Sequence, residues 1–151
     1  MKRRCFNSLI SFLAIALVCL NWPGQALADS ATLEFEKQAL DLDTGTVTEQ
    51  APGLLDGTEG ADVRIGYHAD RIPHAVVFAG EGVTLAVMSG VSYDSVTAAD
   101  VSGLSFSEEV IDQALGANDT VVVKTDAGAT FKLGNAIEDD AGVTFNYEQL
   151  Q

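Results

Sequence analysis

The chain is short and strongly acidic. Its 151 residues include 22 Asp and Glu against 8 Lys and Arg, which gives a formal net charge of −14. This length accommodates one domain of ordinary size. A surface with such an excess of negative charge repels nucleic acid and anionic lipid, so the composition argues against both as partners.

The first 28 residues predict a secretory signal peptide that is cleaved from the mature chain. Residues 2–4 are basic, and residues 9–20 form an apolar segment. That segment is too short for a transmembrane helix, which needs about 20 apolar residues. Ala26-Leu27-Ala28 fits the cleavage site, so we expect the mature chain to begin at Asp29.

Two variants of this leader are also open. Arg3-Arg4 loosely resembles a twin-arginine signal, and Leu17-Val18-Cys19 resembles a lipoprotein box, although a small residue is wanted at Val18. Each of these three types of signal directs export from the cytoplasm. The sequence therefore predicts an extracytoplasmic protein (periplasmic, cell-surface or secreted) with no transmembrane segment in its mature part.

The mature part, residues 29–151, forms one predicted acidic β-rich domain of 123 residues (151 minus 28). Both cysteines, Cys5 and Cys19, lie in the leader, so this domain has no disulfide and depends on its core. Three of the eight basic residues also lie in the leader, which leaves a mature net charge of 5 minus 22, or −17. Such a surface attracts cations, and a solvated acidic surface is the simpler interpretation.

Period-two alternation of apolar and polar residues predicts strands along the first part of the mature chain. Residues 50–60 are rich in Gly, Pro, Asp and Thr and are typical of a loop. A hairpin is expected around Gly80-Glu81-Gly82. The predicted strands of this part are 32–36, 39–43, 46–48, 62–68, 75–79 and 83–88.

Two short helical segments are predicted next. Thr97-Ala98-Ala99-Asp100 resembles a capping box before a single helical turn that Gly103 ends. Residues 107–115 suggest a second short helix, with acidic residues at its start and Gly116 after its end.

The last part of the chain predicts three consecutive antiparallel strands, at 120–125, 129–133 and 143–148. Their alternation places one set of side chains on a common core face: Val121, Val123, Ala129, Phe131, Leu133, Val143, Phe145 and Tyr147. Thr130, Lys132, Thr144 and Asn146 fall on the other face. With little helix, the pattern predicts an all-β fold, a single small sandwich or barrel of about seven or eight mostly antiparallel strands.

A spaced set of short motifs runs through most of the mature chain. Its members are Asp41 to Gly45, Ala61 to Val63, Leu104 to Ser107, Asp119 to Thr125, Gly128, and Lys132-Leu133. This set resembles a bacterial exported β-rich domain of unknown function, which recurs in secreted and surface proteins. The resemblance implies an extracytoplasmic β module and supplies no catalytic residues.

Asp43-Thr44-Gly45 has the local form of an aspartic-protease active-site loop. That chemistry needs two carboxylates that share a proton, so one such loop in a chain of this size would require a homodimer. The late apolar-apolar-Gly segment of such enzymes has its nearest match in Lys132-Leu133-Gly134, where a lysine takes an apolar place. The same tripeptide is also an ordinary strand-ending turn.

Two metal sites are alternatives. Asp41 and Asp43 share a strand face and are candidate Ca²⁺ ligands, together with Glu138, Asp139 or Asp140, although the spacing is not that of an EF-hand. His68, Asp70 and His74 form a weaker candidate set for Zn²⁺, since no fourth ligand is evident.

The sequence therefore predicts an exported non-catalytic binding or structural module of the bacterial cell envelope or exterior. A protein or envelope component is the expected partner, and the oligomeric state is left open. No catalytic residue or cofactor is assigned. The alternatives are a Ca²⁺-binding module and a dimeric aspartic protease that uses Asp43-Thr44-Gly45.

Overall fold

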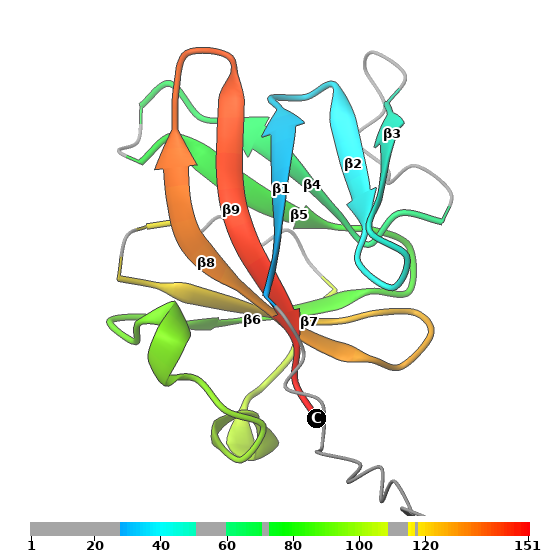
Figure 1. Ribbon diagram of the computed structural model, residues 1–151, viewed down its shortest axis with the longest axis vertical. Coiled ribbons are helices and arrows are strands. Elements are labelled where there is room, and N and C mark those ends of the chain that lie inside the picture. Colours follow the sequence, from blue (N-terminus) through cyan, green and yellow to red (C-terminus); the bar gives the residue numbers. More distant parts are fainter. Residues whose placement is uncertain (1–27, 51–59, 71–72, 109–114, 117) are drawn as a thin grey trace, which may run out of the picture.

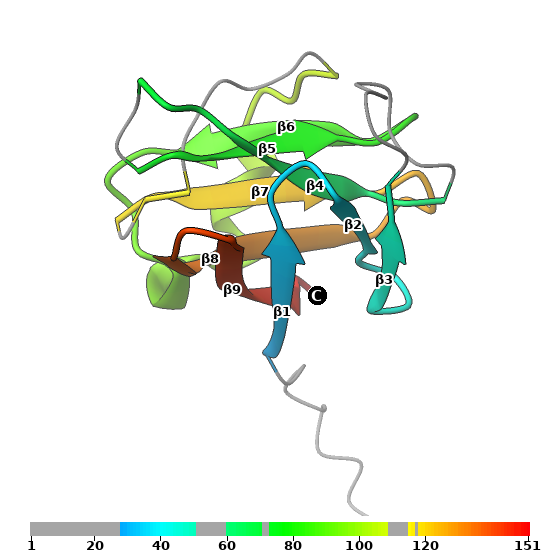
Figure 2. The ribbon, with the colours of Figure 1, turned by 90° about the horizontal axis from the view of Figure 1, so that it is seen from above.

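The computed structural model describes residues 28–50, 60–70, 73–108, 115–116 and 118–151. Within these ranges, nine strands form two antiparallel sheets, and two 3₁₀ turns are the helical elements. The strands β4 and β5 cross behind β9 and β1, and the turned view shows the two layers of strands (Figures 1 and 2). The predicted all-β fold is confirmed.

The larger sheet has five strands in the order β1-β9-β8-β7-β6. Their bounds are Asp29–Glu34 for β1, Gly142–Gln149 for β9, Thr130–Glu138 for β8, Thr120–Lys124 for β7 and Thr84–Met88 for β6. The consecutive strands β7, β8 and β9 are the predicted antiparallel meander.

Strand β8 continues five residues beyond the predicted end at Leu133. Its pairing with β9 shifts register between Gly134 and Ile137, and Asn135 takes a left-handed backbone conformation with φ of 53°. Because the irregularity breaks the period-two alternation and leaves Ile137 73% exposed, this part of the strand has no recognisable sequence pattern.

The smaller sheet has four strands in the order β3-β2-β4-β5. Their bounds are Thr46–Glu49 for β3, Gln38–Asp41 for β2, Val63–Tyr67 for β4 and Ala75–Ala79 for β5. The predicted strands 39–43, 46–48 and 62–68 correspond to β2, β3 and β4, with ends that differ by one or two residues.

The predicted hairpin around Gly80-Glu81-Gly82 is wrong, because β5 and β6 belong to different sheets. The chain crosses between the layers here. A side chain at Gly80 would overlap the carbonyl oxygen of Ala61, and Gly82 has φ of +73°. A short glycine-rich link between two apolar strands looks the same in sequence whether the second strand pairs with the first or crosses over.

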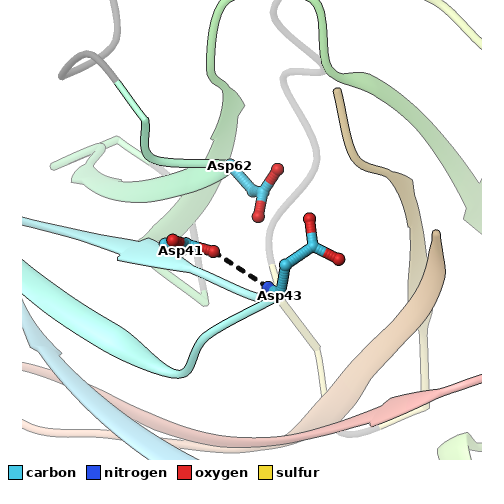
Figure 3. A group of neighbouring side chains, drawn as sticks. All are labelled: Asp41, Asp43 and Asp62. Carbon is cyan, nitrogen blue, oxygen red and sulfur yellow. Dashed lines mark hydrogen bonds between the residues drawn. The ribbon is translucent and has the colours of Figure 1, made fainter. Parts of the chain in front are cut away.

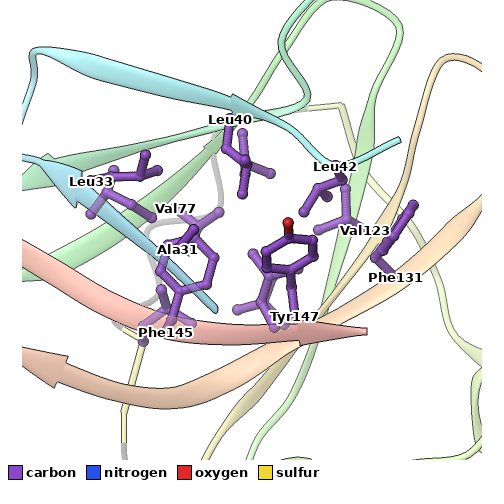
Figure 4. Close-up of a cluster of buried hydrophobic side chains, with 14 of the residues drawn as sticks. Ala31, Leu33, Leu40, Leu42, Val77, Val123, Phe131, Phe145 and Tyr147 are labelled. Carbon is purple, nitrogen blue, oxygen red and sulfur yellow. The ribbon is translucent and has the colours of Figure 1, made fainter. Parts of the chain in front are cut away.

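The core lies between the sheets (Figure 4). Phe145, Leu33 and Leu40 are fully buried in it, and they come from three different strands of both sheets. Phe131 and Val123 belong to the same cluster. The face predicted for the last three strands is therefore confirmed.

The segment with the two 3₁₀ turns, Tyr93–Ser95 and Asp100–Gly103, follows β6, and the first of these turns packs on the opposite face of the larger sheet, where Tyr93 lies against Gly134. Beneath it, Lys132 is only 6% exposed. Its Nζ donates to the carbonyl oxygens of Tyr93 (3.2 Å) and Val96 (3.0 Å) and lies 3.2 Å from a carboxylate oxygen of Glu148. This buried ammonium has an acceptor for each of its three protons.

Of the two predicted helical segments, the structure describes the first and only the ends of the second. The carboxylate of Asp100 accepts from the backbone N–H (2.8 Å) and the hydroxyl (2.6 Å) of Thr97, which confirms the turn expected there. The helix expected over 107–115 falls mostly on residues 109–114, outside the described residues. In the part of the chain that the structure describes, no helix is long and apolar enough to span a membrane.

Candidate cation site and adjoining pocket

The Asp43-Thr44-Gly45 segment forms the tight turn between β2 and β3, and Asp41 holds this turn in place. One carboxylate oxygen of Asp41 accepts from the backbone N–H of Asp43 (2.9 Å) and of Thr44 (3.1 Å). The other accepts from the Thr44 hydroxyl at 2.7 Å. Gly45 completes the turn with φ of +70°. The segment is thus a side-chain-capped turn of the kind that aspartate commonly forms.

Asp62, which sequence reasoning did not select, approaches this turn from the residue before β4. Its backbone N–H donates to the carbonyl oxygen of Leu40 (3.0 Å), and its Oδ2 accepts from the backbone N–H of Leu42 (2.7 Å). Asp62 is only 3% exposed. The strand pairing therefore holds a buried carboxylate beside the end of β2.

Three carboxylates meet at this point, from Asp41, Asp43 and Asp62, with oxygens that all lie within 4.8 Å of one another (Figure 3). Asp43 is exposed, Asp41 is half-buried and Asp62 is buried. Burial raises the pKa of Asp62 to about 6, and the charges of Asp43 and Asp41 add to the rise, whereas the Leu42 N–H opposes it. Either a proton or a cation relieves this repulsion.

The spacing suits one cation. Ca²⁺ binds oxygen ligands at about 2.3–2.6 Å, so two ligands on opposite sides of one ion lie about 5 Å apart at most. The three carboxylate oxygens fall within that limit. Of the residues singled out in the sequence, Asp41 and Asp43 are therefore brought together, and Asp62 completes the group.

The other predicted calcium ligands lie elsewhere. Glu138 is at the opposite end of β5, where its carboxylate contacts the His74 ring at 2.6 Å and accepts from the backbone N–H groups of His74 (2.8 Å) and Ala75 (3.1 Å). Asp139 accepts from backbone N–H groups in the turn between β8 and β9. Asp140 is exposed beside it. None of the three joins the cluster of Asp41 and Asp43.

The proposed zinc ligands do not converge among the described residues, since the metal-compatible group found there contains no histidine. His74 is engaged by Glu138, and its ring stacks on that of Tyr67 at 5.0 Å. The backbone N–H of His68 donates to the carbonyl oxygen of His74.

A pocket of about 240 Å³ adjoins the carboxylate cluster at the end of the sandwich. Its lining combines Asp43, Thr44 and Gly45 of the β2–β3 turn with Phe131 and Tyr147 of the larger sheet. Asp29, Leu42, Glu148 and Gln149 complete the lining. Asp43 is thus shared between the cluster and the pocket.

Comparison with known proteins gives little guidance. No family model matches the chain, and no curated protein matches it. A solved structure, that of the apo HmuY analog TFO from Tannerella forsythia, aligns with 12% sequence identity over 85% of this chain and 98% of that one, at a TM-score of 0.48. A likeness of this degree carries no functional inference, and the resemblance to an exported domain family remains a prediction.

Proposed function

We propose that this chain is an exported, non-catalytic binding module of the bacterial cell envelope or exterior, and that it binds a divalent cation, Ca²⁺, through Asp41, Asp43 and Asp62. The observation that carries the proposal is the buried carboxylate of Asp62, held beside the two carboxylates of the β2–β3 turn.

The physical argument concerns the charge of this group. With a pKa of about 6, Asp62 is mostly ionised at neutral pH, although it is 97% shielded from water and has two acidic neighbours. A buried charge without a counter-charge is unfavourable. A bound cation would neutralise it and make Asp62 a ligand.

The expected affinity is modest. Ca²⁺ takes six to eight oxygen ligands, and three carboxylates leave several positions to water or backbone oxygens. Extracellular calcium modules bind with dissociation constants of about 10⁻⁴–10⁻³ M, which is the range that we expect here.

The dimeric aspartic protease is the weaker candidate. Asp43 lies in an exposed turn that Asp41 fixes, and the turn needs no catalytic role to explain its sequence. The carboxylates beside Asp43 come from the same chain, whereas the retroviral arrangement takes the second one from a symmetry-related copy.

Thermal unfolding with two salts tests the proposal. Matched for ionic strength, CaCl₂ at millimolar concentration should raise the melting temperature more than NaCl, because ligand binding stabilises the folded state by mass action. Asp62→Asn should lose this difference, whereas Asp140→Asn, which removes an exposed charge outside the cluster, should keep it. Equal responses of the unmodified protein to the two salts would refute the cation site.

Export is tested separately by mass spectrometry of the protein recovered outside the cytoplasm. We expect its first residue to be Asp29, because residues 26–28 fit the cleavage site. A retained Met1 or a lipid on Cys19 would contradict that processing.

A further inference from the structure

The pocket beside the β2–β3 turn is lined by the side chain of a largely buried tyrosine, Tyr147, whose hydroxyl has no described protein partner. Tyr147 is only 7% exposed, yet no described residue makes a hydrogen bond with its Oη, which belongs to the pocket lining. The hydroxyl points away from β9 toward the end of β2, where Leu42 lies (Figure 4). The side chain is more than nine-tenths buried, and its unpaired hydroxyl is available to a ligand in the pocket.

Gly45 keeps the space around this hydroxyl open. A Cβ atom at that position would lie 3.0 Å from the Tyr147 Oη, and the backbone has φ of +70°. Any larger residue would therefore press on the hydroxyl and strain the turn. The turn sequence thus serves the pocket as well as the carboxylate cluster.

Two acidic residues line the pocket together with Tyr147. Asp29 lies directly opposite Tyr147 in the pairing of β1 with β9 and shares the core-facing side of β1 with Ala31. Burial raises the pKa of the Tyr147 hydroxyl, and the charge of Asp29 adds to the effect. Asp43, in the β2–β3 turn, also lines the pocket. Glu148 also lines the pocket, but its carboxylate is paired with Lys132.

The remainder of the lining is apolar or neutral. Leu42, Phe131 and the Tyr147 ring supply an apolar surface, and the described residues of the lining include no Lys, Arg or His. Such a pocket disfavours anions. It presents hydrogen-bond acceptors and negative charge above a hydrocarbon surface, a combination that suits an ammonium group attached to an apolar stem.

We propose that this pocket binds a primary ammonium group on a short apolar stem, with Asp29, Asp43 and the Tyr147 hydroxyl as its acceptors. The volume of about 240 Å³ lies below the usual 300–1,000 Å³ of small-molecule sites, which fits a stem of a few carbons. A free alkylamine and a lysine side chain of a partner both carry this group. The proposal does not require the cation site.

Binding of n-butylamine, measured by titration calorimetry in EDTA, tests the proposal. We expect a dissociation constant of about 1 mM for this small ligand. The neutral n-butanol and the anionic butyrate have the same stem and should bind at least about ten times more weakly. Since calcium is absent, a failed cation site would not change the result.

The matched variants are Tyr147→Phe, which removes only the unpaired hydroxyl, and Tyr67→Phe, which removes the hydroxyl of an exposed tyrosine outside the pocket. Tyr147→Phe should weaken butylamine binding about fivefold or more, and Tyr67→Phe should leave it unchanged. Asp29→Asn should weaken it through loss of charge.

A lysine-containing peptide, acetyl-Gly-Lys-Gly-amide, distinguishes the source of the ammonium. Tighter binding of the peptide than of butylamine would support the proposal and indicate a protein partner, whereas the reverse would support it and indicate a small amine. Absence of saturable butylamine binding, binding of butanol as tightly as the amine, or an unchanged affinity in Tyr147→Phe would each overturn it.

Discussion

Replacement of Asp62 by asparagine should stabilise the protein at neutral pH. The asparagine side chain keeps an oxygen for the backbone N–H of Leu42 and removes a charge from a position that is 3% exposed. Most substitutions of buried polar residues destabilise. A gain in stability would therefore be a specific sign of charge repulsion within the cluster.

The sign and size of this stability change follow from the pKa of Asp62. The value rises from 3.8 in the unfolded chain to about 6 in the folded protein, so the folded state favours the protonated acid. The stability contributed by this proton is fully present below about pH 4 and is lost as pH rises through about 6. A pKa change of this size corresponds to a loss of at most about 3 kcal/mol in the free energy of unfolding when Asp62 ionises. Solvent screening near the exposed Asp43 reduces the expected loss to about 1–2 kcal/mol.

Urea unfolding at pH 4.5 and pH 7.5 in EDTA measures the effect. The variant and the unmodified protein should differ little at pH 4.5, whereas the variant should be more stable by about 1–2 kcal/mol at pH 7.5. Asp140→Asn controls for the change in net charge, since this residue is exposed. A variant that is less stable by the same amount at both pH values would refute the reasoning.

Three further results are expected. Phe145→Ala should lower the free energy of unfolding by about 3–5 kcal/mol in urea titrations, whereas Ile137→Ala, at a 73% exposed position, should change it by less than about 0.5 kcal/mol; equal losses would contradict the placement of the core. Calcium affinity should fall about tenfold from pH 7.5 to pH 5, because Asp62 must be ionised to bind, and calorimetry at the two pH values checks this. Lys132→Met should cost about 3 kcal/mol or more, because it leaves Glu148 without its partner and two carbonyl oxygens without a donor; a neutral result in thermal unfolding would show that the buried ammonium is dispensable.

Much of the fold follows from local alternation. Leu33, Leu40 and Phe145 each sit at the centre of a period-two pattern, and each is fully buried. Alternation tells which face of a strand is apolar, but not which strand lies beside it. The predicted hairpin of β5 and β6 was wrong for this reason, because the choice between pairing and crossing depends on contacts between residues that are distant in sequence, such as that of Gly80 with Ala61.

The candidate site could be predicted only in part. Asp41 and Asp43 are close in sequence, and their shared face was readable from the chain. Asp62 is 19 residues beyond Asp43 and joins them only because β2 pairs with β4. The one local signal was an aspartate between apolar Ala61 and Val63, at the start of a buried strand. The sequence predicted that Tyr147 faces the core. It could not predict the surroundings of the hydroxyl, because these depend on how the β2–β3 turn packs against Tyr147.

The burial of Lys132 affects how copies of this protein meet in solution. Of the five basic residues after position 28, Lys132 is 6% exposed and Arg64 is 5% exposed, so at most three remain at the surface of a domain that carries 22 acidic residues. Each molecule is therefore a small polyanion, and approach of two copies is opposed over about a Debye length, roughly 8 Å at physiological ionic strength. This repulsion opposes pairing between copies at the edge strands of both sheets, β1, β6, β3 and β5, and multivalent cations at high concentration would weaken that protection.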